Sequence, residues 1–204
     1  MSFSDTYKTI RSTAKGIFRE KGSRFIAFAS PVSSVEEAKT IIETYKKEYH
    51  DSRHCTYAYI IGHDKSIWRV NDDGEPSGTA GKSILGQIKS HDLTNILIVV
   101  IRYFGGTLLG VSGLMNAYRS AAAEAINNSE IIECQVREYY EIRFPYSRMN
   151  DVMKVLKDGD IIQTDQVFEM NCSIKIGFRL SVREFVLRKL SVVENLTLKH
   201  IETR

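Results

Sequence analysis

Cysteine, proline and tryptophan are scarce in this sequence, whose 204 residues include three cysteines, three prolines and one tryptophan. The cysteines, Cys55, Cys134 and Cys172, are odd in number, lie far apart and form no CxxC pair. This pattern excludes a dense disulfide framework. It predicts reduced thiols, as expected of a cytoplasmic protein.

The sequence also lacks a long apolar run and a strong excess of either charge. Its longest run, Ile96 to Ile101, ends at Arg102. It is far shorter than the roughly 20 residues needed to cross a bilayer, so it predicts a buried strand. Residues 1–16 contain no apolar signal core, which predicts a chain that is not exported and has no membrane partner. A net charge of +3 does not impose binding to duplex nucleic acid, although it leaves room for a local face that binds RNA or phosphate.

The hydrophobic pattern that is present predicts an α+β fold with two domains, residues 1–133 and residues 134–204. Turn residues, capping residues and apolar periodicity define the elements of the first domain. They are a hairpin over 13–18 and 24–29, a helix capped by Ser33 or Ser34 and ending near Tyr49, strands at 56–61 and 67–70, a helix at 80–90, a strand at 96–103 and a helix at 112–127.

The second domain shows a different order of elements. The expected elements are a strand at 139–144, a helix beginning at Ser147 and stopped by Gly159, strands at 161–168 and 172–180, a helix at 182–193 and a strand at 196–201. The order βαββαβ is that of a ferredoxin-like domain.

The stretch from Asn71 to Ser83, NDDGEPSGTAGKS, ends like a nucleotide-binding P-loop and lies between an expected strand and an expected helix. Two features argue against a P-loop. Pro76 occupies a glycine position of the motif, and proline removes an N–H donor and fixes φ. The buried strand also ends in Arg102 rather than in an acid that could hold magnesium.

A simpler interpretation of the same stretch is a tight turn that leads into a helix. Ser77 or Thr79 can cap that helix. Asp72, Asp73 and Glu75 place negative charge where a phosphate would lie, which further disfavours a P-loop.

A second glycine-rich stretch runs from Arg102 to Leu114 and holds four glycines within nine positions. If the two glycine-rich turns converge, each contributes a helix N-terminus to one cleft, because free N–H groups there attract anions. Arg102 and Tyr103 would then suit a phosphate and a stacked base. The alternative is that the glycines simply allow close packing of helix and sheet.

These stretches together resemble the YigZ/Impact family over nearly the whole chain. The matching pieces are KGSRF at 21–25, HCTYAY at 54–59, NDDGEPSGTAG at 71–81, RYFGG at 102–106 and Leu109-Gly110. Two positions depart from the family pattern. Ser83 stands where the family usually has proline, and Asn116 where it often has a basic residue, although Arg119 follows one helical turn later.

The resemblance implies a first domain like the second domain of ribosomal protein S-five and a second domain like domain V of elongation factor G. It also implies a role in regulating translation, as in the eukaryotic relatives, by binding RNA, the ribosome or a translation factor, with no cofactor. Family resemblance and turn chemistry together single out a set of candidate binding residues. They are His54, Asp73, Glu75, Ser77, Gly78, Thr79, Gly81, Arg102, Tyr103, Gly105 and Gly106.

Two other functions fit the residues and stay open. The first is a hydrolase acting on a phosphorylated or peptide substrate with Asp73 and Glu75, although the chain has no GxSxG motif and the nucleophile candidates lack a partner. The second is an interaction scaffold in which the motifs only hold the fold. The histidines at 50 and 54 need not share a face and lack a third ligand cluster, so no metal site is predicted.

Overall fold

The computed structural model describes residues 5–157 and 160–204. Their internal contacts divide them into two compact units, residues 7–134 and residues 135–204, with Asp5 and Thr6 grouped with the second unit. Two contacts explain this grouping. The backbone oxygen of Asp5 accepts a 2.6 Å hydrogen bond from the N–H of Val136, and its carboxylate lies 3.0 Å from the guanidinium of Arg179. The sequence had placed residues 1–133 together.

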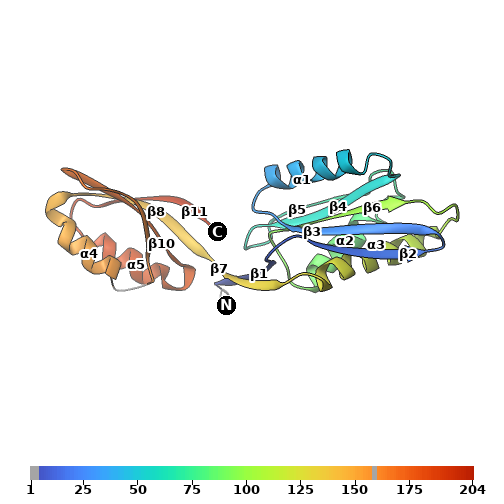
Figure 1. The fold of residues 1–204 in the computed structure, drawn as a ribbon. Helices are drawn as coiled ribbons and strands as arrows, with labels where there is room; N and C mark the ends of the chain where they lie inside the picture. Colours follow the sequence, from blue (N-terminus) through green and yellow to red (C-terminus); the bar gives the residue numbers. More distant parts are fainter. Residues whose placement is uncertain (1–4, 158–159) are drawn as a thin grey trace. The chain divides into compact units, whose positions relative to one another are not determined.

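A five-stranded sheet forms the centre of the first unit (Figure 1). Its strands, in spatial order, are β2 (Ala14–Glu20), β3 (Ser23–Pro31), β6 (Ile96–Tyr103), β4 (His54–Ile61) and β5 (Ile67–Asn71). All four neighbouring pairs are antiparallel. Two further strands, β1 (Thr6–Ile10) and β7 (Ile131–Gln135), pair in a separate two-stranded sheet that the sequence pattern did not predict.

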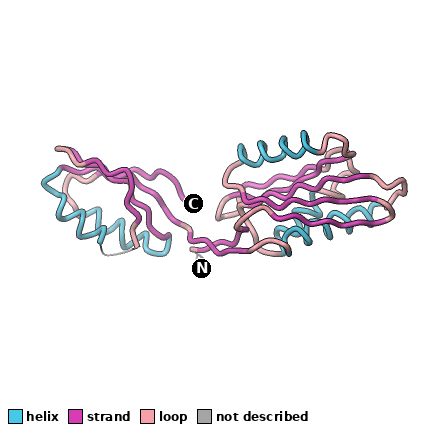
Figure 2. The backbone as a smooth tube through the Cα atoms, in the orientation of Figure 1, coloured by secondary structure: helices cyan, strands magenta, loops and turns pink. Residues whose placement is uncertain are grey.

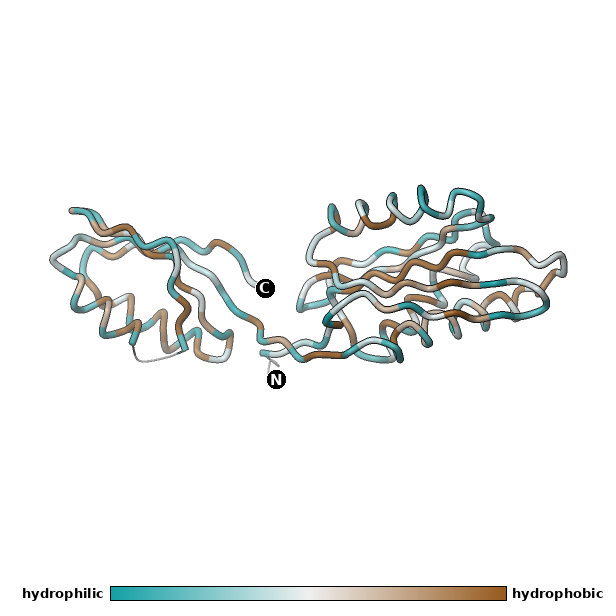
Figure 3. Tube along the Cα trace, viewed as in Figure 1, coloured by the Kyte–Doolittle hydropathy of each residue, from teal (hydrophilic) through white to brown (hydrophobic). Residues whose placement is uncertain are grey.

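Helices cover both faces of the five-stranded sheet. Helix α1 (Val35–Glu48) lies on one face, and α2 (Gly81–Ser90) and α3 (Gly110–Asn127) lie on the other (Figure 1). Strand β6 is therefore apolar from Ile96 to Ile101, as Figure 3 shows for the central strands, because these residues alternate between two cores. Ile98 and Val100 pack with α2 and α3, whereas Val99 and Ile101 pack on the α1 side.

The second unit has the predicted βαββαβ order. Its elements are β8 (Arg137–Pro145), α4 (Met149–Lys157), β9 (Ile162–Val167), β10 (Asn171–Arg179), α5 (Arg183–Ser191) and β11 (Thr197–Thr203), with single 3-10 turns before each helix. The strands lie in the order β11-β8-β10-β9 and are antiparallel throughout. Both helices lie on one side of these strands (Figure 2). This is the ferredoxin-like arrangement. Gly159, predicted to stop α4, lies outside the described residues.

The structure confirms the predicted α+β class and the type of every element predicted within the described residues, with boundaries that differ by at most two residues. Ser34 caps α1 by accepting the N–H of Glu37 at 3.1 Å, as the sequence indicated. None of the helices in the described ranges is both long and apolar enough to span a membrane.

Candidate functional site

A buried ion pair links the two glycine-rich stretches. The Nη1 atom of Arg102, at the end of β6, lies 2.5 Å from Oε1 of Glu75, which belongs to the turn between β5 and α2. Both side chains are almost fully buried, with 6% and 3% of their areas exposed. The guanidinium also lies 5.4 Å from the ring centre of Phe25 and 5.6 Å from that of Phe104. The charge of Arg102 is therefore largely balanced from within the protein.

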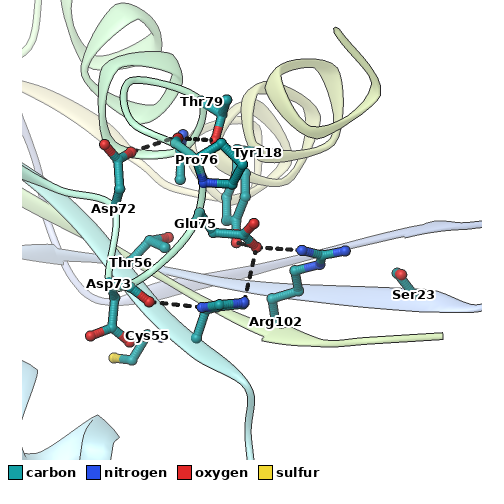
Figure 4. A network of polar contacts seen from close by, with 12 residues as sticks. Ser23, Cys55, Thr56, Asp72, Asp73, Glu75, Pro76, Thr79, Arg102 and Tyr118 are labelled. Carbon is teal, nitrogen blue, oxygen red and sulfur yellow. Dashed lines mark hydrogen bonds and ion pairs between the residues drawn. The ribbon is translucent and has the colours of Figure 1, made fainter. Parts of the chain in front are cut away.

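Glu75 is the centre of a small polar network (Figure 4). The hydroxyl of Tyr118, from α3, donates to the same Oε1 atom at 2.7 Å. Burial, reinforced by the negative charge of Glu75, raises the pKa of Tyr118, so this hydroxyl keeps its proton. The network holds α3 against the turn before α2.

His54 completes this network from β4, where it is the register partner of Arg102. Its Nδ1 atom lies 2.7 Å from the backbone oxygen of Asp73. A carbonyl oxygen can only accept, so Nδ1 carries a proton. The other ring nitrogen, Nε2, faces Glu75 at 3.6 Å.

The turn from Asp72 to Gly81 is organised around the carboxylate of Asp72. This carboxylate accepts the N–H groups of Gly78 at 2.7 Å, Ala80 at 3.0 Å and Gly81 at 2.8 Å. Gly78 lies in the turn, whereas Ala80 and Gly81 are the capping position and the first residue of α2, so an anion from the chain itself already fills that helix end. The expected anion-binding terminus of α2 is thus occupied.

The prediction that Ser77 or Thr79 caps α2 is wrong. The capping position is Ala80, which makes no side-chain cap bond, and the hydroxyl of Thr79 donates instead to the backbone oxygen of Pro76 at 2.7 Å. The sequence did not indicate that Asp72 caps α2, because Asp72 lies eight residues before the capping position. Its carboxylate reaches that position only through the folded turn.

Asp73 and Glu75, the acids of the hydrolase hypothesis, are each held by different partners. The carboxylate of Asp73 accepts the backbone N–H of Cys55 at 2.7 Å, and that of Glu75 binds Arg102 and Tyr118. Burial raises the pKa of the Cys55 thiol to about 11, with the charge of Asp73 adding to the effect. A thiol in that state is a poor nucleophile at neutral pH.

Tyr103 does not join Arg102, contrary to expectation. Successive residues of a strand point to opposite faces, and Tyr103 packs on the α1 side of the sheet. There its hydroxyl donates to Asp51 at 2.8 Å, and the guanidinium of Arg24 lies 4.7 Å from its ring centre. The expected pairing of arginine and aromatic ring in one phosphate and base site is therefore wrong for these two residues.

The two glycines after Phe104 have different roles. A Cβ atom on Gly105 would lie 1.9 Å from the backbone carbon of Gly22, so only glycine lets this turn press against the β2–β3 hairpin. Gly106 has a φ of +86° and open space around it. Gly105 thus serves close backbone packing, between two turns rather than between helix and sheet.

A pocket of about 410 Å³ opens between the two glycine-rich stretches. Its lining residues are Arg53, His54, Glu75, Pro76, Arg102, Phe104, Leu108, Leu109, Gly110, Val111 and Leu114. Three predicted binding residues, His54, Glu75 and Arg102, line it. The other eight do not, and they are Asp73, Ser77, Gly78, Thr79, Gly81, Tyr103, Gly105 and Gly106.

Sequence reasoning missed the apolar wall of the pocket. Leu108 is 83% exposed, Val111 59% and Phe104 43%. The apolar residues between Phe104 and Val111 are visible in the sequence and could have indicated such a wall. Only the fold shows that they are exposed and that they border the charged network. Among the described residues, no group of three or more histidine, cysteine or acidic side chains is placed to hold a metal ion.

The protein therefore consists of two α+β units. The first unit carries a pocket with an apolar mouth and a polar network beneath it. The Impact N-terminal domain matches residues 21–126, and the chain belongs to the IMPACT family. The family member YvyE of Bacillus subtilis is 32% identical over 179 residues, which cover 88% of this chain and 81% of that protein. The family member YigZ of Escherichia coli is 35% identical over 149 residues, 71% of this chain and 73% of its own.

A solved structure has the same overall fold. The crystal structure of a hypothetical protein superimposes with a TM-score of 0.74 at 26% identity, covering 98% of this chain and 99% of its own. More distant relatives include the Protein IMPACT homolog of Saccharomyces cerevisiae, 32% identical over 117 residues that cover 56% of this chain and 45% of that protein. The family resemblance read from the motifs is confirmed.

Proposed function

We propose that this chain is a cytoplasmic regulatory protein of translation that acts by binding rather than by catalysis. Its kinship with proteins named IMPACT from yeast and mammals supports a regulatory role. A hydrolase is disfavoured because the carboxylates of Asp73 and Glu75 are held by internal partners and burial keeps the thiol of Cys55 protonated.

The pocket between the turns supports a protein partner, namely a translation factor or a ribosomal protein. A site built for RNA backbone presents unpaired cations and exposed stacking rings. Here the pocket offers one such cation, Arg53, and one such ring, Phe104. Arg102 is paired inside the protein, and Tyr103 lies on the other face of the sheet. The exposed surface at the mouth is instead apolar, through Leu108 and Val111, which is characteristic of protein interaction sites.

The proposal is tested in a reconstituted bacterial translation system. Wild-type protein at micromolar concentration is expected to change the rate of reporter synthesis and to cosediment with ribosomes or a purified factor. Leu108→Asp should abolish both effects, because it places a charge on the apolar mouth without disturbing the core. Val192→Asp is the matched control, since Val192 is 81% exposed but belongs to the other unit.

Two results would count against the proposal. If Leu108→Asp and Val192→Asp behave like the wild type, the pocket mouth takes no part in the interaction. If binding survives Leu108→Asp but disappears on treatment with ribonuclease or in high salt, the contact is with RNA and the protein partner is wrong.

A further inference from the structure

The N-terminus of α3 opens into the pocket without a side-chain cap from the described part of the chain. Leu109 occupies the capping position and makes no side-chain cap bond, and the first turn contains no acidic residue. Gly110 and Val111, the first residues of the helix, both line the pocket. Free N–H groups and the positive end of the helix dipole favour an anion at such a place.

Arg102 supplies a second, independent indication of an anion. Only its Nη1 atom has a hydrogen-bond partner among the described residues, and its Nε atom is buried with none. Figure 4 shows a single contact between the guanidinium of Arg102 and Glu75. The edge formed by Nε and Nη2 is one of those that bind a carboxylate with two parallel hydrogen bonds.

The charges around the pocket also favour an anion. Arg102 and Glu75 balance each other, whereas the side chain of Arg53, exposed and lining the pocket, has no ion pair in the described part of the chain. With Arg53 and the helix dipole, the pocket carries a positive excess. The anion must also have an apolar body, because the walls are Phe104, Leu108 and neighbouring apolar residues.

We propose that the pocket binds the C-terminal carboxylate of a partner polypeptide whose last residues are apolar. This inference rests on the proposed function and names the chemistry that the partner presents. The carboxylate lies between the N-terminus of α3 and the Nε–Nη2 edge of Arg102, and the last side chain fills the pocket, whose 410 Å³ suits a small ligand group. Capture of a C-terminal carboxylate by backbone N–H groups is an established mode of peptide recognition.

A peptide suits this surface better than a small apolar acid does. Leu108 and Val111 are 83% and 59% exposed, so the apolar wall extends beyond the pocket itself. The residues that precede a peptide's C-terminus would cover this wall, whereas a small acid would leave it in water.

The test uses fluorescein-labelled hexapeptides whose last two residues are drawn from leucine, isoleucine, valine and phenylalanine. One library ends in a free carboxylate and the other in an amide. Fluorescence polarisation with the full chain should show the acid library bound at least about tenfold more tightly, because the amide loses charge-assisted hydrogen bonds. Leu108→Asp and Arg53→Ala should weaken binding of the acid library, and Val192→Asp should leave it unchanged.

Several results would overturn the inference. Equal affinity for acid and amide, or no binding of the acid library, removes the carboxylate from the site. Competition by decanoate at least as strong as that by unlabelled acid peptides would assign the pocket to a small apolar acid. If either result accompanies a loss of ribosome or factor binding in Leu108→Asp, the proposed function stands and only the carboxylate inference fails.

Discussion

Helices α2 and α3 cover the same face of the five-stranded sheet, and each follows a glycine-rich turn, but their first turns are filled differently. The carboxylate of Asp72 accepts one N–H group in the turn before α2 and two at the start of the helix. The start of α3 has neither a side-chain cap nor an acid in its first turn, and it faces a pocket. One helix end is thus completed by the chain, and the other is left for a ligand.

The difference shows that a glycine-rich turn before a helix does not by itself indicate a binding site. The stretch most typical of a phosphate loop, Asp72 to Gly81, is satisfied internally, whereas the other stretch leads into the pocket. Glu75 and Arg102 connect the two turns, so damage to their ion pair should affect both.

The largest effect is expected from breaking that connection. Arg102→Ala should lower the free energy of unfolding by about 3–5 kcal/mol, because it leaves Glu75 buried without its counter-ion. Urea denaturation followed by circular dichroism measures this loss. Loss of partner binding in this variant would therefore not identify a ligand contact.

Arg53→Ala is the matched control for Arg102→Ala. Arg53 is exposed at the rim of the same pocket, so its removal should change stability by less than about 0.5 kcal/mol. Combining Arg102→Ala with Glu75→Gln should cost less than the sum of the single variants. A loss below about 1 kcal/mol for Arg102→Ala alone would mean that the pair is solvated rather than buried.

Most of the fold could be predicted from the sequence because its signals are local. The continuous apolar run at 96–101 indicated a strand covered on both faces, and alternation of its residues between two cores confirms this. Strands β1 and β7 were missed, since each is short and they pair across more than a hundred residues. No turn or periodicity marks such a pairing.

Less of the site could be predicted, because its contacts join distant residues. Nothing local indicates that Glu75 meets Arg102 or that Asp72 reaches the start of α2. The separation of Arg102 from Tyr103 was available from the sequence, since neighbouring residues of a strand point to opposite faces. The family motif grouped them although strand geometry places them apart.

A smaller effect is expected from removing the Asp72 carboxylate from the start of α2. Asp72→Ala should lower the free energy of unfolding by about 2 kcal/mol, because the three N–H groups lose a charged acceptor. Hydrogen exchange at Gly81 should accelerate with it. Asp73→Asn is the control, because within the described ranges the Asp73 carboxylate accepts one backbone N–H, that of Cys55, and asparagine tolerates its positive φ. Equal losses in the two variants would contradict the role given to Asp72.

The smallest effect is expected from adding a negative charge at the N-terminus of α3. Val111→Asp places a carboxylate in the first turn of α3, and Val111→Asn is its uncharged match. The aspartate variant should be more stable by about 0.5 kcal/mol at low salt, because the negative charge meets the positive end of the helix.

This advantage carries a pH dependence with a defined sign. The helix N-terminus lowers the pKa of an aspartate in the folded state. The gain in stability is therefore present above the unfolded-state pKa of about 3.9 and is lost as the pH falls through the folded-state pKa. Thermal unfolding of both variants between pH 2 and 7 measures it. The same aspartate should also exclude carboxylate peptides by occupying their place. An aspartate variant that is no more stable than its asparagine match, and that still binds the acid library, would show that the end of α3 does not attract anions and would remove the difference between the two helices.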